Sequence, residues 1–325
     1  MSAIIEANFN EQITFDEAKK RIKEMNMIDG FLFDSIMEDE DAAKIVSKNI
    51  IGTTLNIDLV DVVVTAQKVI TGVDSVNHGI RLDAQIIHND KTNEDSATVY
   101  DIEMENRASD RLELPKRQRY YVGLIDTKTL PTNTIYRNLP EYVSITILSY
   151  DPFLAGDMYY EASTNLITHP DIEYKDGVKH IYLYAYGNNN LSDKSYGERL
   201  SEMLKYIVDG EKKDMPSAPI AEMDYLVSQV KDRAEVTKNY MKKWDYELHL
   251  RRDITEEVTQ QVTQQVTQQV TQQVTQQVTQ QVTQQITDRI NMLHKKLIDD
   301  GRLDDLTKAV TDKAYQQKLF EEYNI

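Results

Sequence analysis

The chain has 325 residues, of which 40% are hydrophobic and 28% are charged, a composition typical of a globular protein with a sizeable core. It contains no cysteine, which excludes disulfides, thiolate metal sites and cysteine nucleophiles. The formal net charge of −17 argues against broad, nonspecific binding to nucleic acid, which normally relies on a basic surface. The N-terminus does not read as a signal peptide, and no apolar run approaches about 20 residues, so we expect a cytoplasmic protein without a membrane span.

Hydrophobic periodicity and turn residues in the first two thirds of the chain predict an α/β core with a mixed sheet flanked by helices. Pro115 is tolerated only in the first turn of a helix, which fixes where the middle helix begins. In chain order, the expected elements are helices at 15–25 and 30–50, strands at 59–70, 79–88 and 97–105, a helix at 116–126, strands at 142–149, 158–162 and 179–186, and a helix at 198–208.

Acidic residues alternate with apolar ones along the expected strand 97–105. Successive side chains of a strand point to opposite faces, so Asp101, Glu103 and Glu105 share one face. Neighbouring carboxylates repel one another and are costly to keep ionised without a cation. If Asp83 comes from the adjoining strand, the cluster could bind a hard divalent metal. The same alternation is typical of a solvent-exposed strand face, and the spacing alone favours that simpler interpretation.

A resemblance to a known family supports the metal site. The segments that carry it are 29–37, 79–83, 100–105, 114–121, 139–147, 150–153, 180–184 and 204–207. Their order and spacing resemble the bacterial recombination-promoting nuclease / putative transposase family, which belongs to the PD-(D/E)XK nuclease superfamily. The resemblance covers roughly residues 12–210. It implies a restriction-endonuclease-like core and a metal-dependent DNA endonuclease that hydrolyses phosphodiester bonds in recombination or in mobile elements.

The resemblance also implies site residues. Asp83 and Glu103 would bind Mg²⁺ or Mn²⁺, which lowers the pKa of a bound water and neutralises developing charge. Gln85 lies two residues after Asp83, on the same strand face, and could orient water. The superfamily usually has lysine where this chain has Glu105, which could be a further ligand, a general base or a sign of lost activity. A substitute cation could come from the following helix, where Lys116, Arg117 and Arg119 lie, with Lys116 as the candidate.

Two other functions remain open. Glu105 and the acidic net charge favour a catalytically impaired nuclease-fold protein that binds nucleic acid or a partner and oligomerises through a helical extension. A helical scaffold, in which the α/β domain is incidental, is the third hypothesis. Binding to DNA would depend on a local basic cluster after the acidic strand, made of Arg107, Arg111, Lys116, Arg117 and Arg119.

A four-residue repeat dominates the last third of the chain. The unit Val258-Thr259-Gln260-Gln261 recurs until Gln285, without a single charge. A four-residue spacing moves the valine stripe by about 40° per unit around a helix, which argues against a long left-handed coiled coil, where the period is near 3.5. Val and Thr are mediocre helix formers, so helix, strand and disorder all remain open, although the flanking context favours helix. The repeat could serve as a spacer or as an oligomerisation rod.

These observations divide the chain into four parts. We expect a PD-(D/E)XK nuclease-like domain at 1–215 and a helical linker at 216–257. The tandem repeat follows at 258–287, and a short helical tail at 288–325 completes the chain. The expected partner is DNA, and a homo-oligomer through the C-terminal helical region is a further option.

Overall fold

The order of helices and strands confirms the α/β class expected from the sequence. The computed structural model describes residues 12–59, 63–66, 69–70, 80–81, 84–89, 97–130, 133 and 135–325. The chain forms two compact units, Met1–Tyr246 and Glu247–Ile325. The helices of the first unit are α2 (Phe15–Glu24), α3 (Gly30–Met37), α4 (Glu40–Leu55), α5 (Leu114–Thr129), α6 (Lys194–Asp209) and α7 (Ala218–Asp232), with short 3-10 helices at Ala108–Asp110 and Tyr136–Asn138.

A six-stranded mixed sheet forms the centre of this unit. Its strands are β1 (Val63–Ala66), β4 (Ala84–Asn89), β5 (Ala97–Glu105), β6 (Glu141–Leu148), β7 (Tyr159–Ser163) and β8 (Val178–Tyr184), in the spatial order β1-β4-β5-β6-β8-β7. The β1–β4–β5 pairs are antiparallel and the β5–β6–β8 pairs are parallel. Helix α5 provides the crossover that the parallel pair β5–β6 requires. The short strands β2 (Val69–Ile70) and β3 (Ile80–Arg81) pair separately.

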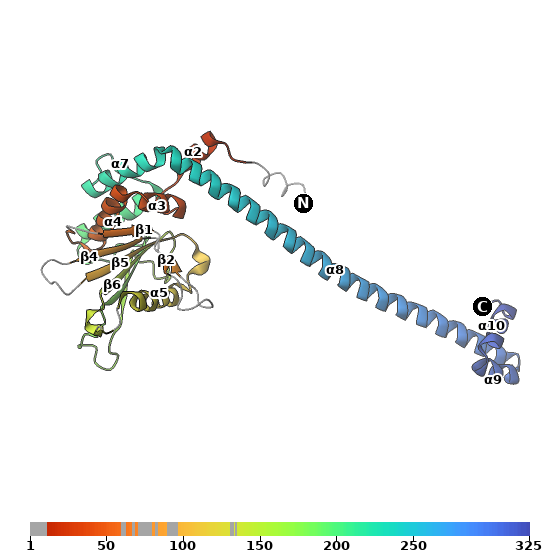
Figure 1. The fold of residues 1–325 in the computed structure, drawn as a ribbon. Coiled ribbons are helices and arrows are strands. Elements are labelled where there is room, and N and C mark those ends of the chain that lie inside the picture. The colour runs from red at the N-terminus through yellow and green to blue at the C-terminus, as the bar shows by residue number, and fades with distance from the viewer. Residues whose placement is uncertain are drawn as a thin grey trace. The chain divides into compact units, whose positions relative to one another are not determined.

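One face of the sheet builds the main hydrophobic core. Ile102, Ile145 and Ile181 lie side by side on β5, β6 and β8, and all three are fully buried. Helices α2, α3, α4, α6 and α7 contribute apolar side chains to the same cluster. Figure 1 shows α3 and α4 on one side of the sheet and α5 on the other. Helix α5 covers the opposite face, where Leu124 and Ile125 pack against strand residues. The two faces of the sheet are therefore covered by different helices, and α5 covers the second face along β5.

Several expected boundaries differ from the structure. The helix expected at 30–50 is two helices, because the side chain of Asp39 accepts a hydrogen bond from the Ala42 N–H and caps the start of α4. The strands expected at 59–70 and at 79–88 are each divided between two sheets. Strands β1 and β4 belong to the six-stranded sheet, whereas β2 and β3 form the two-stranded one. Helix α5 was expected from about residue 116, or from an earlier start with a break, and runs unbroken from Leu114 with Pro115 in its first turn.

Helix α7 belongs to the first unit, although the sequence placed residues 216–257 in a linker. Its buried residues Ile220, Met223, Val227 and Val230 join the main core. They recur at the three- and four-residue spacing of one helix face. The boundary at residue 215 therefore lies short of the compact unit, which extends to Tyr246.

The tandem repeat is helical in the structure. It lies within the long helix α8 (Ala234–Asp299), and every residue from 249 to 289 is exposed. Val270 in the middle of the repeat is 51% exposed, and the other repeat valines are exposed to a similar extent. None of the described residues therefore buries the valine stripe.

The end of the chain forms a small helical cluster. Gly301, with φ +71, ends α8 in the left-handed conformation that glycine favours, and α9 (Leu303–Thr311) and α10 (Lys313–Glu322) follow. Their apolar sides pack around a buried group made of Leu293, Leu297, Ala309 and Leu319. The helical tail expected at 288–325 is therefore a folded three-helix arrangement with its own core.

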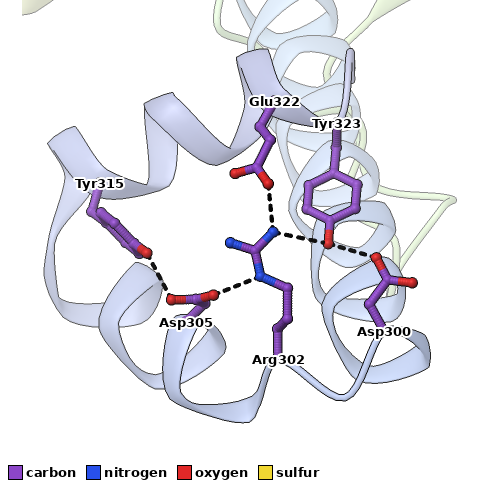
Figure 2. Close-up of polar contacts among 6 residues, drawn as sticks. All are labelled: Asp300, Arg302, Asp305, Tyr315, Glu322 and Tyr323. Carbon is purple, nitrogen blue, oxygen red and sulfur yellow. Dashed lines mark hydrogen bonds and ion pairs between the residues drawn. The ribbon is translucent and has the colours of Figure 1, made fainter.

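A polar network centred on Arg302 connects these three helices, as Figure 2 shows. The Arg302 guanidinium donates to Asp305 at 2.6 Å and to Glu322 at 2.5 Å. The Tyr315 hydroxyl donates to Asp305 at 2.7 Å, and the Tyr323 hydroxyl donates to an oxygen of Asp300 at 2.7 Å. The hydrogen bond from Tyr315 and the contact with Arg302 hold the pKa of Asp305 below its ordinary value.

Acid should loosen this cluster through Asp305. Because the pKa of Asp305 is lower in the folded state, its contribution to stability is complete above the ordinary value of 3.8 and is lost as the pH falls through the folded value. We expect the methyl NMR signals of Ala309 and Leu319 to shift or broaden over that acidic range. An Asp305→Asn variant should show the loosened signals at neutral pH already. An identical acid response in both proteins would contradict this prediction.

Candidate active site on strand β5

The three acids of β5 are buried. Asp101 is 0%, Glu103 7% and Glu105 4% exposed, and all three belong to the face of the sheet that α5 covers. Their neighbours Tyr100 and Ile102 join the main core on the other face. The predicted alternation is therefore confirmed, whereas the interpretation as a solvent-exposed strand face is wrong. Three carboxylates buried side by side are costly, and such clusters are characteristic of functional sites.

Asp101 lies at the most deeply buried end of the cluster. The Tyr142 hydroxyl on β6 donates to Asp101 Oδ2 at 2.8 Å. Burial and then the charge of Asp101 raise the pKa of Tyr142 well above its ordinary value, so this hydroxyl stays protonated and remains a donor. Ser144 lies beside Asp101 in the sheet, and its hydroxyl is 2.8 Å from His180 Nδ1. Burial lowers the pKa of His180, so its imidazole is neutral at physiological pH.

Glu105 lies at the other end of the cluster and is held from two sides. Arg117 Nη1 is 2.9 Å from Glu105 Oε2, and the backbone N–H of Arg107 donates to Oε1 at 2.9 Å. Burial alone would lower the pKa of Arg117, but the charge of Glu103 and the hydrogen bond to Glu105 raise it above its ordinary value. The helix cation that reaches the acids is thus Arg117, while the expected candidate Lys116 is exposed.

Glu103 lies between the other two acids, beside a buried polar pair. Thr146 of β6 is its neighbour in the sheet, and the Gln118 side-chain amide donates to the Thr146 hydroxyl at 3.5 Å. Gln118 is fully buried, and its Oε1 has no hydrogen-bond partner among the described residues. A buried amide oxygen of this kind can accept a hydrogen bond from a water or from another ligand in the site.

The expected partners on β4 are only partly described. Asp83 lies outside the described residues, so its pairing with Glu103 stays a prediction. Gln85 lies on β4 opposite Asp101 in the register, and its side chain is outside the description. Within the described part of the chain, no group of three or more His, Asp or Glu side chains is arranged to hold a metal ion. Carboxylate oxygens are nevertheless the ligands that Mg²⁺ prefers, so the donor chemistry of Glu103 fits that ion.

The phase of helix α5 explains why Arg117, rather than the candidate Lys116, reaches the acids. Residues three and four apart share a helix face, and α5 begins at Leu114, a buried residue. Arg117 and Gln118 follow it by three and four residues, whereas Lys116 follows it by two and therefore points elsewhere. The buried position of Leu114 therefore predicts that Arg117, and not Lys116, faces the acids of β5.

No family model, no curated protein and no solved structure matches this chain. A search of the described helices found none apolar enough over 18 residues to span a lipid bilayer. The fold and the site define a mixed α/β domain that buries an acidic cluster between one strand and its crossover helix.

Proposed function

We propose that this protein is a metal-dependent DNA endonuclease that hydrolyses phosphodiester bonds in recombination or in mobile elements. The observation that supports it best is the burial of Asp101, Glu103 and Glu105 on one face of β5. Burial of carboxylates without function would lower stability, and a divalent cation offsets the repulsion between them. The segments that resemble the nuclease family contain the same three acids.

Glu103 and Asp83 are the proposed metal ligands. When bound, Mg²⁺ or Mn²⁺ would activate a water molecule and neutralise charge on the phosphate. Asp101 and Glu105 are already engaged by Tyr142 and Arg117, which fixes the two ends of the cluster around Glu103. Gln118 supplies a buried acceptor on the helix side of the same carboxylate row.

Basic side chains near the end of β5 give DNA a local docking surface. Arg107 directly follows the strand and is exposed, and Arg119 lies exposed on α5. Arg111 lies between them and is partly exposed. A short basic surface of this kind can attract phosphates even on a protein whose net charge is −17.

Cleavage of supercoiled plasmid in Mg²⁺ or Mn²⁺ tests the proposal directly. The wild type should nick the plasmid, whereas Asp83→Asn and Glu103→Gln should not. Glu161→Gln is the matched control, because Glu161 is an exposed glutamate on β7 that pairs with Lys179. Equal nicking by the wild type and both site variants would remove the assignment.

One observation favours a second candidate, a nuclease-fold protein that binds DNA without cutting it. The Arg117 guanidinium already neutralises part of the acidic cluster through Glu105 at 2.9 Å. A protein cation in that place reduces the need for a metal ion. If the protein binds DNA without cutting it, neither the wild type nor any of the three variants would nick the plasmid. Arg107→Gln would nevertheless weaken DNA binding.

A further inference from the structure

We propose that the Arg117 guanidinium and the Tyr150 hydroxyl form an anion subsite that holds the phosphate being cleaved, next to Glu103. This inference rests on the proposed function and names the residues that would hold its substrate. Tyr150 follows β6, and Arg117 comes from the first turn of α5, so the subsite joins a strand end to the helix that covers it.

Glu105 fixes the guanidinium in one position. Its carboxylate is buried and accepts hydrogen bonds from Arg117 and from the Arg107 backbone. The Arg117 side chain is itself 23% exposed, so its charge lies where the buried cluster meets solvent. An anchored, partly exposed guanidinium is suited to bind phosphate oxygens, because its N–H groups form a rigid, planar set of donors.

Buried polar atoms around this guanidinium point to a missing ligand. Within the described residues, no hydrogen-bond partner is found for Arg117 Nε, Tyr150 Oη or Gln118 Oε1, although all three atoms are buried. Buried polar atoms in folded proteins nearly always have partners. The first two are donors, which suit phosphate oxygens, and the third is an acceptor, which suits a water molecule.

Tyr150 lies close to the same charges. Its ring packs with Leu114, Leu148 and Tyr182. Burial, followed by the charge of Glu105, raises the pKa of Tyr150 to about 12, while Arg117 acts in the opposite direction. The hydroxyl therefore keeps its proton at neutral pH and can donate it in a hydrogen bond to an anion.

The charges of the cluster explain why such a subsite is needed. Asp101, Glu103 and Glu105 would repel an approaching phosphodiester, which carries a negative charge of its own. Arg117 provides positive charge at the exposed end of this row and can place the phosphate next to Glu103. The two donors would also distinguish an anionic phosphate from a neutral ligand of the same size.

Two variants test the subsite. Tyr150→Phe removes only the hydroxyl and should slow single-turnover nicking in Mg²⁺ about tenfold, the effect of one lost hydrogen bond. Arg117→Gln should slow it about a hundredfold, since a charged donor is lost. DNA binding can be measured in Ca²⁺, which does not support cleavage. Under these conditions, Arg117→Gln should reduce the magnitude of the slope of log affinity against log salt by about 1, the contribution of one phosphate contact.

Thermal melting separates this role from a structural one. Tyr150→Phe should not lower the melting temperature, because the hydroxyl has no partner among the described residues. Tyr160→Phe is the matched control, since its hydroxyl bonds to Asp151 and to the backbone of Asp157. That control should melt earlier than the wild type and nick at the wild-type rate. If Arg117→Gln does not fold, Arg117→Lys replaces it, because lysine keeps the charge but loses the planar set of donors.

The results separate the subsite from the proposed function. Loss of nicking in Glu103→Gln together with wild-type rates in Tyr150→Phe and the Arg117 variant would overturn the subsite and leave the nuclease assignment intact. Equal nicking by the wild type, Asp83→Asn and Glu103→Gln would end the nuclease assignment. In that case, an unchanged salt slope in the Arg117 variant would overturn the subsite as well.

Discussion

Replacing Glu103 with glutamine should reduce Mg²⁺-dependent nicking by at least about a hundredfold, because the variant loses an anionic metal ligand. Glutamine has almost the same shape as glutamate, so the packing under α5 should not change. The substitution also removes one negative charge from a buried row of three. We therefore expect a melting temperature within a few degrees of the wild type, or above it.

The nicking rate and the melting temperature together distinguish a loss of catalysis from a loss of folding. Initial nicking rates on supercoiled plasmid give the first value, and thermal melting followed by circular dichroism gives the second. Glu161→Gln makes the same chemical change at an exposed site and should leave both values unchanged. A stable Glu103→Gln protein that nicks at the wild-type rate would show that this carboxylate does not serve the reaction.

Replacing Leu297 with alanine should detach the C-terminal helices α9 and α10. Leu297 is fully buried in a small cluster with Leu293, Ala309 and Leu319, so its truncation leaves a cavity at the centre of the core that α9 and α10 share with the end of α8. A buried Leu→Ala change costs about 2–5 kcal/mol. A cluster of this size rarely supplies more than about 3–5 kcal/mol, so the variant should lose most of its packing.

Hydrogen exchange measured by mass spectrometry can follow this loss. Peptides from 303–311 and 313–322 should exchange much faster in the variant, while peptides from the sheet should not change. Val270→Ala is the control, because Val270 is exposed in the repeat and alanine favours helix by up to about 0.7 kcal/mol. Wild-type protection of α9 and α10 in Leu297→Ala would contradict the prediction.

Local patterns in the sequence predicted the central strands of the sheet, but not the division of the segments 59–70 and 79–88 between two sheets. The alternation from 97 to 105 gave both the extent of β5 and the shared face of its three acids. The burial of that face could not be predicted in the same way, because it depends on α5 docking on it. Docking is decided by contacts such as Val99 with Leu124, which join residues distant in sequence. The alternation therefore defined the row of acids, and only the tertiary structure decided how they contact solvent.

The helices were predicted less accurately, for two physical reasons. Lys116 was chosen as the cation because of its charge, although the phase set by Leu114 brings Arg117 to the acids instead. Helix α7 was read as linker, because its apolar residues are interleaved with charged ones. Its four buried residues have helical spacing, but the surface that receives them comes from α2, α3 and α4. The spacing of apolar residues in a sequence indicates a helix face, but it does not indicate which other elements that face packs against.

The exposed repeat of α8 has an evolutionary consequence. The four-residue units from Val258 to Gln285 are identical and uncharged, and all their residues are exposed among the described residues, so a gain or loss of whole units breaks no packing there. Each added unit lengthens the helix by about 6 Å. DNA slippage during replication can therefore change the number of units with little penalty to folding, and variants of this chain should differ in copy number here while their sheet stays the same length.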